Sequence, residues 1–256
     1  MRYWQETWAV AQRILTELVR RRRSLIFWCI FPVTILWLNG LILAERAQLT
    51  NAQAFEAAAP GTLVGAALFF SCLGGSVATV VAEREQRTLK RLFMSPLSGL
   101  SYFLGIFVAH GVIALGQSLI VGAIASFTGA TFQGMVLGGL IISLSVIAYV
   151  GVGFILGTQF ARRTEDVNAL VAAFGVPLLI LGGAFLPTRF FPQVLLDIAQ
   201  FNPVYHMTEA LTGVVAEGKS MEEIGNHCIF LAIFAVGVTI AGWLSYRRML
   251  QVERRL

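Results

Sequence analysis

The chain has 256 residues, of which 57% are hydrophobic and 13% are charged, and its mean hydropathy is +0.74. A soluble domain of this length carries roughly twice that share of charged residues, so the composition excludes an ordinary water-soluble protein. The net charge of +5 does not indicate a nucleic-acid partner, because the basic residues gather in alternate loops between long apolar runs.

Residues 1–24 predict an amphipathic helix that lies in the inner membrane interface. One face of this helix collects apolar side chains at spacings of three and four residues: Trp4, Trp8, Ala11, Leu15 and Leu18. Four arginines at 20–23 follow directly, where they would meet anionic lipid head groups. The alternative is a short soluble helix that ends in a stop-transfer cluster of charges.

Six apolar runs are each long enough to cross a hydrocarbon core as a helix, which takes about 20 residues. They cover residues 25–44, 61–82, 102–127, 132–160, 167–187 and 227–246, and none contains Asp, Glu, Lys or Arg. The sequence therefore predicts an all-α membrane protein, with an interfacial helix at 1–24 and a domain of six transmembrane helices at 25–256.

The distribution of lysine and arginine predicts the orientation in the membrane. The N-terminus, the loops after the second and fourth runs and the C-terminus together hold 16 of them, and the alternate loops hold 3. The positive-inside rule places the richer set in the cytoplasm, so both termini are expected there.

The stretch GVVAEGKS at 213–220 fits the phosphate-binding pattern G-x-x-x-x-G-K-[ST]. The predicted orientation places it outside the cytoplasm, where ATP is essentially absent, and the preceding residues do not form a strand core. A helix end explains it better, with Gly213 or Gly218 as the cap and Lys219 in solvent.

The loop after the second run predicts a short amphipathic helix in the cytoplasm. Leu89, Leu92 and Phe93 share one face, and Pro96 ends the helix near Met94. Such a helix is either a solvated connector or a docking element for a soluble partner.

The pattern E-x-E-x-x-T-L-x-x-L-x-x-x-P-L-S, from Glu83 to Ser98, resembles the loop between the second and third spans of type-2 ABC exporter permeases. The resemblance implies a coupling loop at 83–99 that docks on an ATP-binding subunit. Its apolar contacts would come from Leu89, Leu92 and Phe93, and its other site residues would be Glu83, Glu85, Arg87, Thr88 and Arg91. Arg87 departs from the family, which often has glycine there.

The segment at 182–211 is similar to the outer segment of the same family, with a Gly-Gly pair, a Phe-x-Pro and an Asn-Pro. We expect a re-entrant outer segment at 188–216, made of two short helices at the outer mouth; the alternative is a helix lying on the outer leaflet. The residues that carry this expectation are Phe190, Phe191, Pro192, Asn202, Pro203 and Tyr205.

Other features support only local expectations. His110, alone in its span, is expected to be a hydrogen-bonded packing residue, and His206 has the spacing to pair with Glu209. Three G-x-x-x-G spacings, at 61–65, 134–138 and 153–157, allow close approach of helices, either within one subunit or at a dimer seam.

The resemblance implies the permease subunit of an ABC exporter in the bacterial cytoplasmic (plasma) membrane, moving a drug, an antibiotic or a lipid-like molecule. The implied partners are two copies of a separate ATP-binding subunit, a second copy of this chain or a similar permease, and membrane lipids, but no nucleic acid. No cofactor, metal or catalytic residue is expected in this chain, since ATP would bind the partner. The alternatives are a permease for lipid-linked polysaccharide or glycolipid, an ion-coupled carrier, which the lack of acidic residues in the runs disfavours, and a membrane enzyme acting on lipids.

Overall fold

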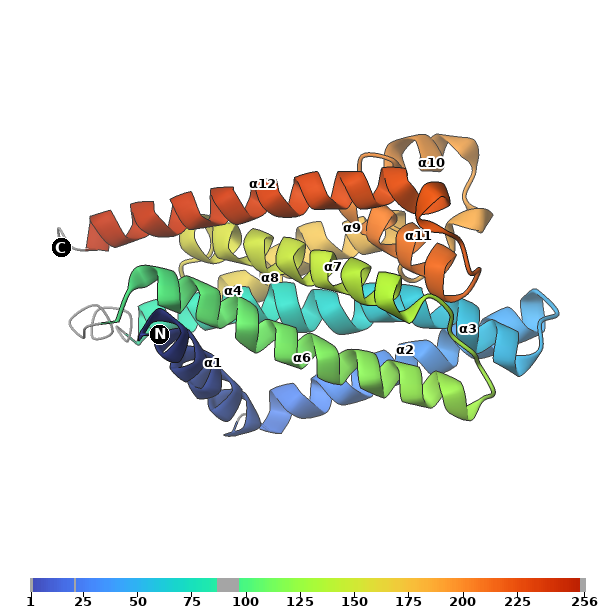
Figure 1. Ribbon diagram of the computed structural model, residues 1–256, viewed down its shortest axis with the longest axis horizontal. Coiled ribbons are helices and arrows are strands. Elements are labelled where there is room, and N and C mark those ends of the chain that lie inside the picture. Colours follow the sequence, from blue (N-terminus) through green and yellow to red (C-terminus); the bar gives the residue numbers. More distant parts are fainter. Residues whose placement is uncertain (1, 21, 87–96, 254–256) are drawn as a thin grey trace.

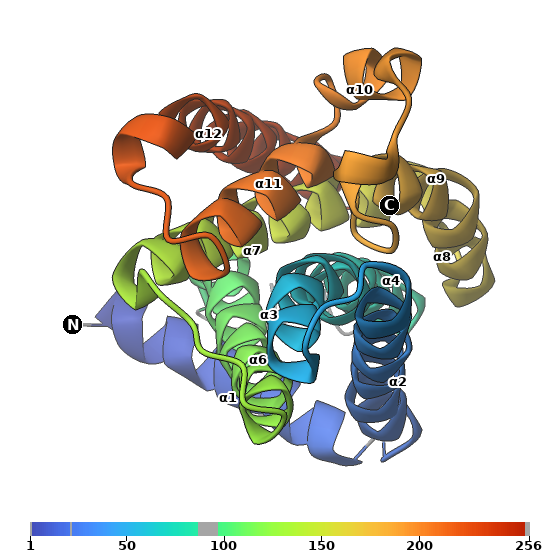
Figure 2. The same cartoon turned by 90° about the vertical axis from the view of Figure 1, so that its right-hand side faces the viewer.

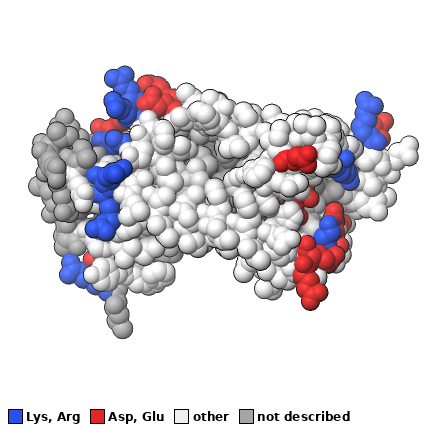
Figure 3. Space-filling view, turned by 90° about the horizontal axis from the view of Figure 1, so that it is seen from above, with Lys and Arg blue, Asp and Glu red and all other residues white. Residues whose placement is uncertain are grey.

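The computed structural model describes residues 2–20, 22–86 and 97–253, and within these ranges every regular element is helical. Most of the helices run along the long axis of the molecule (Figure 1). The prediction of an all-α membrane protein is therefore confirmed. Charged side chains gather towards the two ends, and a broad uncharged belt lies between them (Figure 3).

Five helical stretches in the described residues are long and apolar enough to cross a membrane. They are α2 (Arg22–Arg46); a second span made of α3 (Asn51–Thr62), η1 (Leu63–Gly74) and α4 (Gly75–Glu85); α6 (Gly99–Phe127); α7 (Met135–Ile155) continued by η2 (Leu156–Phe160); and α12 (Met221–Glu253). They correspond to the first four predicted runs and to the sixth.

The fifth predicted run forms a composite helix of α8 (Thr164–Leu170), η3 (Val171–Gly175) and α9 (Val176–Leu181). This helix is not among the five, so the count of six spans remains a prediction. It also ends earlier than the apolar run. The chain turns at Gly183, whose φ of +75° belongs to the left-handed region that glycine adopts without strain.

The second span is the centre of the bundle. In its most apolar stretch 78% of the residues are buried, compared with 17% in α2 and 22% in α12. Viewed from the end, α3 and α4 lie among the other helices (Figure 2). A helix surrounded in this way reaches lipid over little of its surface, whereas α2 and α12 expose a large apolar face.

All three G-x-x-x-G spacings contribute to packing inside the subunit. A Cβ added at Gly65 would lie 2.6 Å from Ala184, and one added at Gly138 would lie 2.9 Å from Val215. The tightest contact is at Gly153, where an added Cβ would lie 1.9 Å from the Ser76 hydroxyl of α4. Gly153 and Gly138 let α7 approach the second span and α11 (Pro203–Val215) more closely than any other residue would, and Gly65 lets the second span approach Ala184.

Helix α1 (Arg2–Arg20) lies across the beginning of α6, within the range expected for the amphipathic helix, and its place in a lipid interface stays a prediction (Figure 1). The face packed in the bundle consists of Thr7, Val10, Ala11 and Ile14, and it shares only Ala11 with the predicted apolar stripe. Trp4 and Trp8 are 69% and 53% exposed. The helix therefore has two apolar faces, one against α6 and one free to enter a lipid interface.

His110 is buried in α6 against Gly75, where a Cβ added to the glycine would lie 2.8 Å from the imidazole. The expectation of a packing residue is confirmed. The expected hydrogen bond stays a prediction.

Candidate functional site

The first flank of the 87–96 stretch is fixed by a buried carboxylate. Glu83, in the last turn of α4, is 5% exposed, and its two oxygens accept hydrogen bonds from Arg13 of α1 and from the Tyr102 hydroxyl of α6. The Tyr102 ring stacks on Tyr246 of α12, with ring centroids 5.4 Å apart. Glu83 therefore joins three helices and points into the bundle, whereas the sequence resemblance implied a place at the docking surface.

Arg84 ties the same end of α4 to the fourth span. Its guanidinium donates to the carbonyl oxygens of Gly157 (2.9 Å) and Ala161 (3.1 Å), at the C-terminal end of η2. The last carbonyls of a helix have no partner within the helix and carry partial negative charge, so a cation there satisfies and stabilises them. Arg84 thus ties the second span to the fourth at the end of the bundle where the 87–96 stretch begins.

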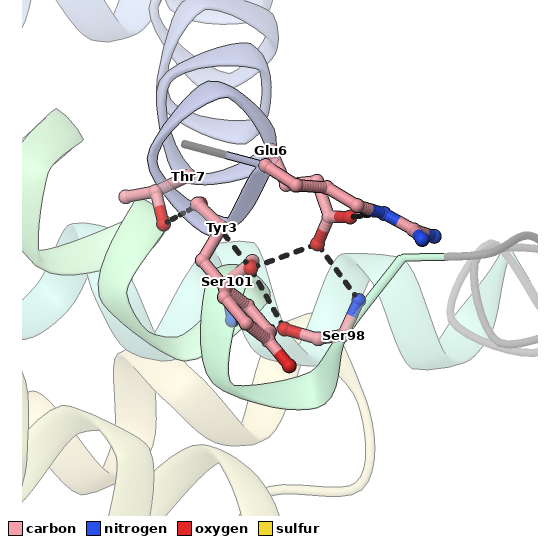
Figure 4. A network of polar contacts seen from close by, with 6 residues as sticks. Tyr3, Glu6, Thr7, Ser98 and Ser101 are labelled. Carbon is pink, nitrogen blue, oxygen red and sulfur yellow. Dashed lines mark hydrogen bonds and ion pairs between the residues drawn. The ribbon is translucent and has the colours of Figure 1, made fainter.

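The second flank is fixed to α1 as well (Figure 4). Ser98 caps α6 by accepting a hydrogen bond from the Ser101 backbone N–H at 3.0 Å. Glu6 of α1 accepts from the Ser98 N–H at 3.1 Å and from the Ser101 hydroxyl at 2.9 Å. These two donors, the Ser98 N–H first, hold the pKa of the Glu6 carboxyl below its ordinary value. Both hydrogen bonds have the charged Glu6 carboxylate as acceptor, and such bonds are stronger than neutral ones, so they orient the beginning of α6.

Helix α1 is therefore fastened to both flanks of the 87–96 stretch, through Arg13 on one side and Glu6 on the other. Of the predicted coupling-loop residues, Glu83 is buried and Glu85 lies exposed at the end of α4. Six of them lie outside the described residues, and the docking helix stays a prediction: Arg87, Thr88, Leu89, Arg91, Leu92 and Phe93. Sequence reasoning missed Arg13, Tyr102 and Glu6, because their roles depend on how α1 lies on α6.

The outer segment (188–216) contains two short helices, α10 (Gln193–Ala199) and α11, separated by a break at Asn202. The Asn202 side chain accepts from the Val204 N–H at 3.0 Å and donates to the Leu178 carbonyl of α9 at 2.7 Å. Pro203 follows as the first residue of α11, where its missing N–H costs nothing. The expected pair of short helices is present, and its depth in a membrane stays a prediction.

The predicted outer residues take different positions. Phe191 is buried, while Phe190 is exposed under a cation–π contact with Arg189 at 5.1 Å. Pro192 precedes α10, and Tyr205 lies half-buried in α11. Glu209 accepts a hydrogen bond from the Thr188 hydroxyl at 2.5 Å, and His206 contacts His227 of α12. The pairing of His206 with Glu209 that the sequence spacing allowed is therefore replaced by these two contacts.

The GVVAEGKS stretch is a helix end. Gly213 lies buried within α11, and the Lys219 N–H closes the turn on the Gly213 carbonyl at 2.8 Å. Gly218 has a φ of +66°, and the Lys219 ammonium pairs with Glu217 at 2.6 Å. The expected helix end and solvated lysine are confirmed, but the cap is Ala216 and neither glycine, because Gly213 lies inside α11 and Gly218 lies two residues past the cap. The residues before the pattern form a helix where a phosphate-binding loop needs a strand.

This geometry predicts opposite outcomes for Gly218→Ala and Lys219→Ala. We expect G218A to lower the free energy of unfolding by about 1–2 kcal/mol, the cost of a left-handed backbone for a residue with a Cβ. We expect K219A to change the free energy of unfolding by less than about 1 kcal/mol, because an exposed ion pair contributes little. Thermal unfolding of the two purified variants checks both expectations; a K219A variant as destabilised as G218A would contradict the helix-end interpretation.

An apolar hollow of about 310 Å³ opens between the second span, the fourth span and the α8–α9 helix. Three aromatic side chains line it: Phe69, Phe160 and Phe174. All three wide-turn segments of the described chain, η1, η2 and η3, contribute to its wall. Such π-helical turns are rare and often lie at functional sites, so the hollow is a second candidate site.

Comparison with known proteins identifies the family of the chain. Residues 23–244 match the family described as ABC-2 family transporter protein, and this is most of the 256-residue chain. The chain therefore belongs to the ABC-2 transporter family and is a multi-pass integral membrane protein.

Three curated relatives are similar over about two thirds of the chain. A probable multidrug ABC transporter permease of Escherichia coli, YbhR, is 26% identical over 66% of this chain. The inner membrane transport permease YhhJ of Escherichia coli is 26% identical over 62% of this chain, and the linearmycin resistance permease protein LnrN of Bacillus subtilis is 24% identical over 68%. The matches span 46%, 42% and 45% of those proteins, so the chain covers less than half of their length.

Proposed function

We propose that this chain is the membrane-spanning permease subunit of an ABC-type exporter in the bacterial cytoplasmic membrane. ATP would be hydrolysed on two separate ATP-binding subunits, and the chain itself would bind no cofactor and catalyse no reaction. The observation that carries the proposal is the fastening of both flanks of the 87–96 stretch to α1, within a chain of the ABC-2 family. A loop that transmits force needs stiff flanks, whereas a mere connector does not.

The contacts suggest how motion would pass from the loop to the spans. Docking of the ATP-binding subunit on Leu89, Leu92 and Phe93 would push on the end of α4 and on the beginning of α6. Glu83 would transfer the push to α6 through Tyr102, and Arg84 would transfer it to the end of η2. The second, third and fourth spans would then move together. Glu83 acts here as a positioning residue inside the permease.

The hollow between the second span and the α8–α9 helix supports an apolar or amphiphilic cargo. Its exposed lining is apolar, and the Phe69 ring packs on Gly175 of η3, where an added Cβ would lie 2.2 Å away. Two relatives are named for multidrug transport and linearmycin resistance. We therefore propose drug or antibiotic efflux, with lipid-linked polysaccharide or glycolipid export as the second candidate.

Assembly and orientation complete the proposal. Two permeases, either two copies of this chain or this chain with a similar one, would face each other, with both termini in the cytoplasm. The outer segment would re-enter the outer leaflet beside the exit. The exposed Trp4 and Trp8 of α1 would lie in the inner lipid interface.

The chain has two lysines, Lys90 and Lys219, and they allow a direct test. A membrane-impermeant amine reagent should modify Lys219 in intact cells and Lys90 only in lysed membranes. The hydrogen bond to Glu217 raises the pKa of the Lys219 amine, so less free amine is present at a given pH and labelling belongs at alkaline pH. Lys90 should become more reactive after urea strips peripheral subunits from the membranes, while Lys219 serves as the internal control. Mass spectrometry reads both sites.

The pattern of labelling separates the parts of the proposal. Modification of Lys90 from outside would overturn the orientation and with it the coupling loop. The expected orientation, with equal Lys90 reactivity before and after stripping, would overturn docking at this loop while leaving the topology intact.

A further inference from the structure

Two histidines join the outer segment to α12. His206 Nδ1 lies 2.9 Å from His227 Nδ1, across the contact between α11 and α12. His206 Nε2 lies 2.9 Å from the Gln200 carbonyl oxygen, at the corner between α10 and α11. The His206 ring also stacks on Phe230, with centroids 3.9 Å apart and planes 15° apart. The ring is therefore fixed in its plane and bonded through both nitrogens.

The proton positions follow from donor and acceptor chemistry. A carbonyl oxygen only accepts, so His206 Nε2 must carry the hydrogen in its bond to Gln200. In the neutral ring Nδ1 is then the acceptor. His227 Nδ1 must therefore be the donor, which leaves His227 Nε2 with its lone pair. One assignment of tautomers satisfies all of these contacts.

Successive protons have opposite effects on this arrangement. The first proton can bind His227 Nε2, which leaves the hydrogen bond between the rings in place. The His227 ring, which donates that bond, is then a cation, so the hydrogen bond becomes stronger. The second must bind His206 Nδ1, the atom that accepts the bond. Two N–H groups and two positive charges then face each other at the position of a hydrogen bond, and the contact becomes repulsive.

We propose that His206 and His227 form a proton-controlled latch, which holds the outer segment on α12 while the pair carries at most one extra proton and opens when both rings are charged. Imidazole is the side chain that ordinarily titrates between about pH 5 and pH 8. The consequence for export rests on the proposed function, because an open outer segment would alter the exit for cargo.

The surroundings contain charges of both signs. The described charged and titratable groups near the pair on the surrounding elements are Tyr205 and Glu209 on α11, Glu217 and Lys219 before α12, Glu222, Glu223 and Cys228 at the beginning of α12, Glu56 on α3 and Asp197 on α10. Helices α7 and α9, which also pack on α11, carry no Asp, Glu, Lys or Arg. Glu209 favours a proton on His206, whereas Lys219 opposes one on His227, and the charge of the first proton opposes the second.

The chain has three histidines, so the tautomers can be read directly by ring-¹⁵N NMR of the full-length permease in nanodiscs. We expect Nε2–H on His206 and Nδ1–H on His227 at neutral pH, with two separated protonation steps. Independent titration of the two rings, each with the tautomer mixture of free histidine, would overturn the latch.

A native thiol reports the opening. Cys228 is buried on the face of α12 that also carries Ile224, whose side chain lies against Gly213 of α11. Its labelling by a disulfide reagent that reacts in acid should rise about tenfold between neutral pH and about pH 4.5, which corresponds to loss of one charge-assisted hydrogen bond. Labelling that does not change with pH would overturn the proposal.

Two variants separate the roles of the rings. His206→Gln keeps a donor for Gln200 at the place of Nε2 but has no atom at the place of Nδ1 to accept from His227, so Cys228 should label fast at every pH. His227→Asn can donate through Nδ2 or accept through Oδ1, so it can bond His206 in either protonation state, and Cys228 should label slowly at every pH. His110→Asn, remote from the pair, is the control for loss of an imidazole. None of these measurements uses transport, so failure of the latch is distinguishable from failure of the proposed function.

Discussion

Replacing Arg13 by methionine is expected to destabilise the permease more than replacing its partner Glu83 by glutamine. The R13M variant leaves a carboxylate buried without its cation, while in E83Q the Arg13 side chain, 29% exposed, can still reach water. Breaking a fully buried pair costs about 3–5 kcal/mol, and the partial exposure of Arg13 reduces this to about 2–3 kcal/mol. We therefore expect a fall in Tm of roughly 5–10 °C for purified R13M.

Arg2→Met is the matched control, because the same substitution on the same helix removes a pair with Glu6 in which Arg2 is 72% exposed. Such surface pairs contribute about 0–1 kcal/mol, so R2M should unfold close to the wild type. The double variant R13M/E83Q should recover part of the loss, since it removes the unpaired charge. Equal Tm values for R13M and R2M would show that the Glu83 contact does not hold α1 to the spans.

Gly153→Ala is expected to destabilise the contact between α7 and α4. The added Cβ would lie 1.9 Å from the Ser76 hydroxyl and 3.1 Å from the Leu73 carbonyl oxygen, so a new rotamer of Ser76 relieves only part of the clash. Overpacking of this kind costs about 1–3 kcal/mol. Thermal unfolding of the purified permease measures the loss.

The same helix provides the comparison for this substitution. A Cβ added at Gly139 has no neighbour within 4 Å, so Gly139→Ala should keep or raise stability, by up to about 1 kcal/mol from helix propensity. Ser76→Gly combined with G153A should restore part of the lost stability, because it removes the clashing side chain. If G153A and G139A behaved alike, the close approach of α7 to α4 would be wrong.

The membrane spans could be predicted, because long apolar runs without charged residues rarely occur outside a membrane. The residues at which the helices begin and end could not be predicted in the same way. The second apolar run begins at Gly61, whereas the helix begins at Asn51. A capping box between Thr50 and Gln53 starts it, and this T-x-x-Q signal is present in the sequence. The fifth run shows the opposite error, because hydropathy does not register the left-handed turn at Gly183.

The flanks of the loop could be predicted only in part. The resemblance placed Glu83 near a docking surface, and a charged residue beside a span normally does point to water. Its burial depends on Arg13 and Tyr102, which are distant in sequence and come together only when α1 lies on α6. Single-chain periodicity located the α1 helix and its exposed tryptophans, but it did not predict the second face, with Val10 and Ile14, that is buried against the bundle.

The fastening of α1 to both flanks of the loop has a thermodynamic consequence. If docking of a partner on the loop changes how firmly α1 is held, it also changes the free energy with which Trp4 and Trp8 enter the lipid interface. Linkage makes this coupling reciprocal, so the lipid composition of the inner leaflet must alter the affinity for the partner by the same factor. The bilayer would then act as an effector of the assembly as well as its solvent.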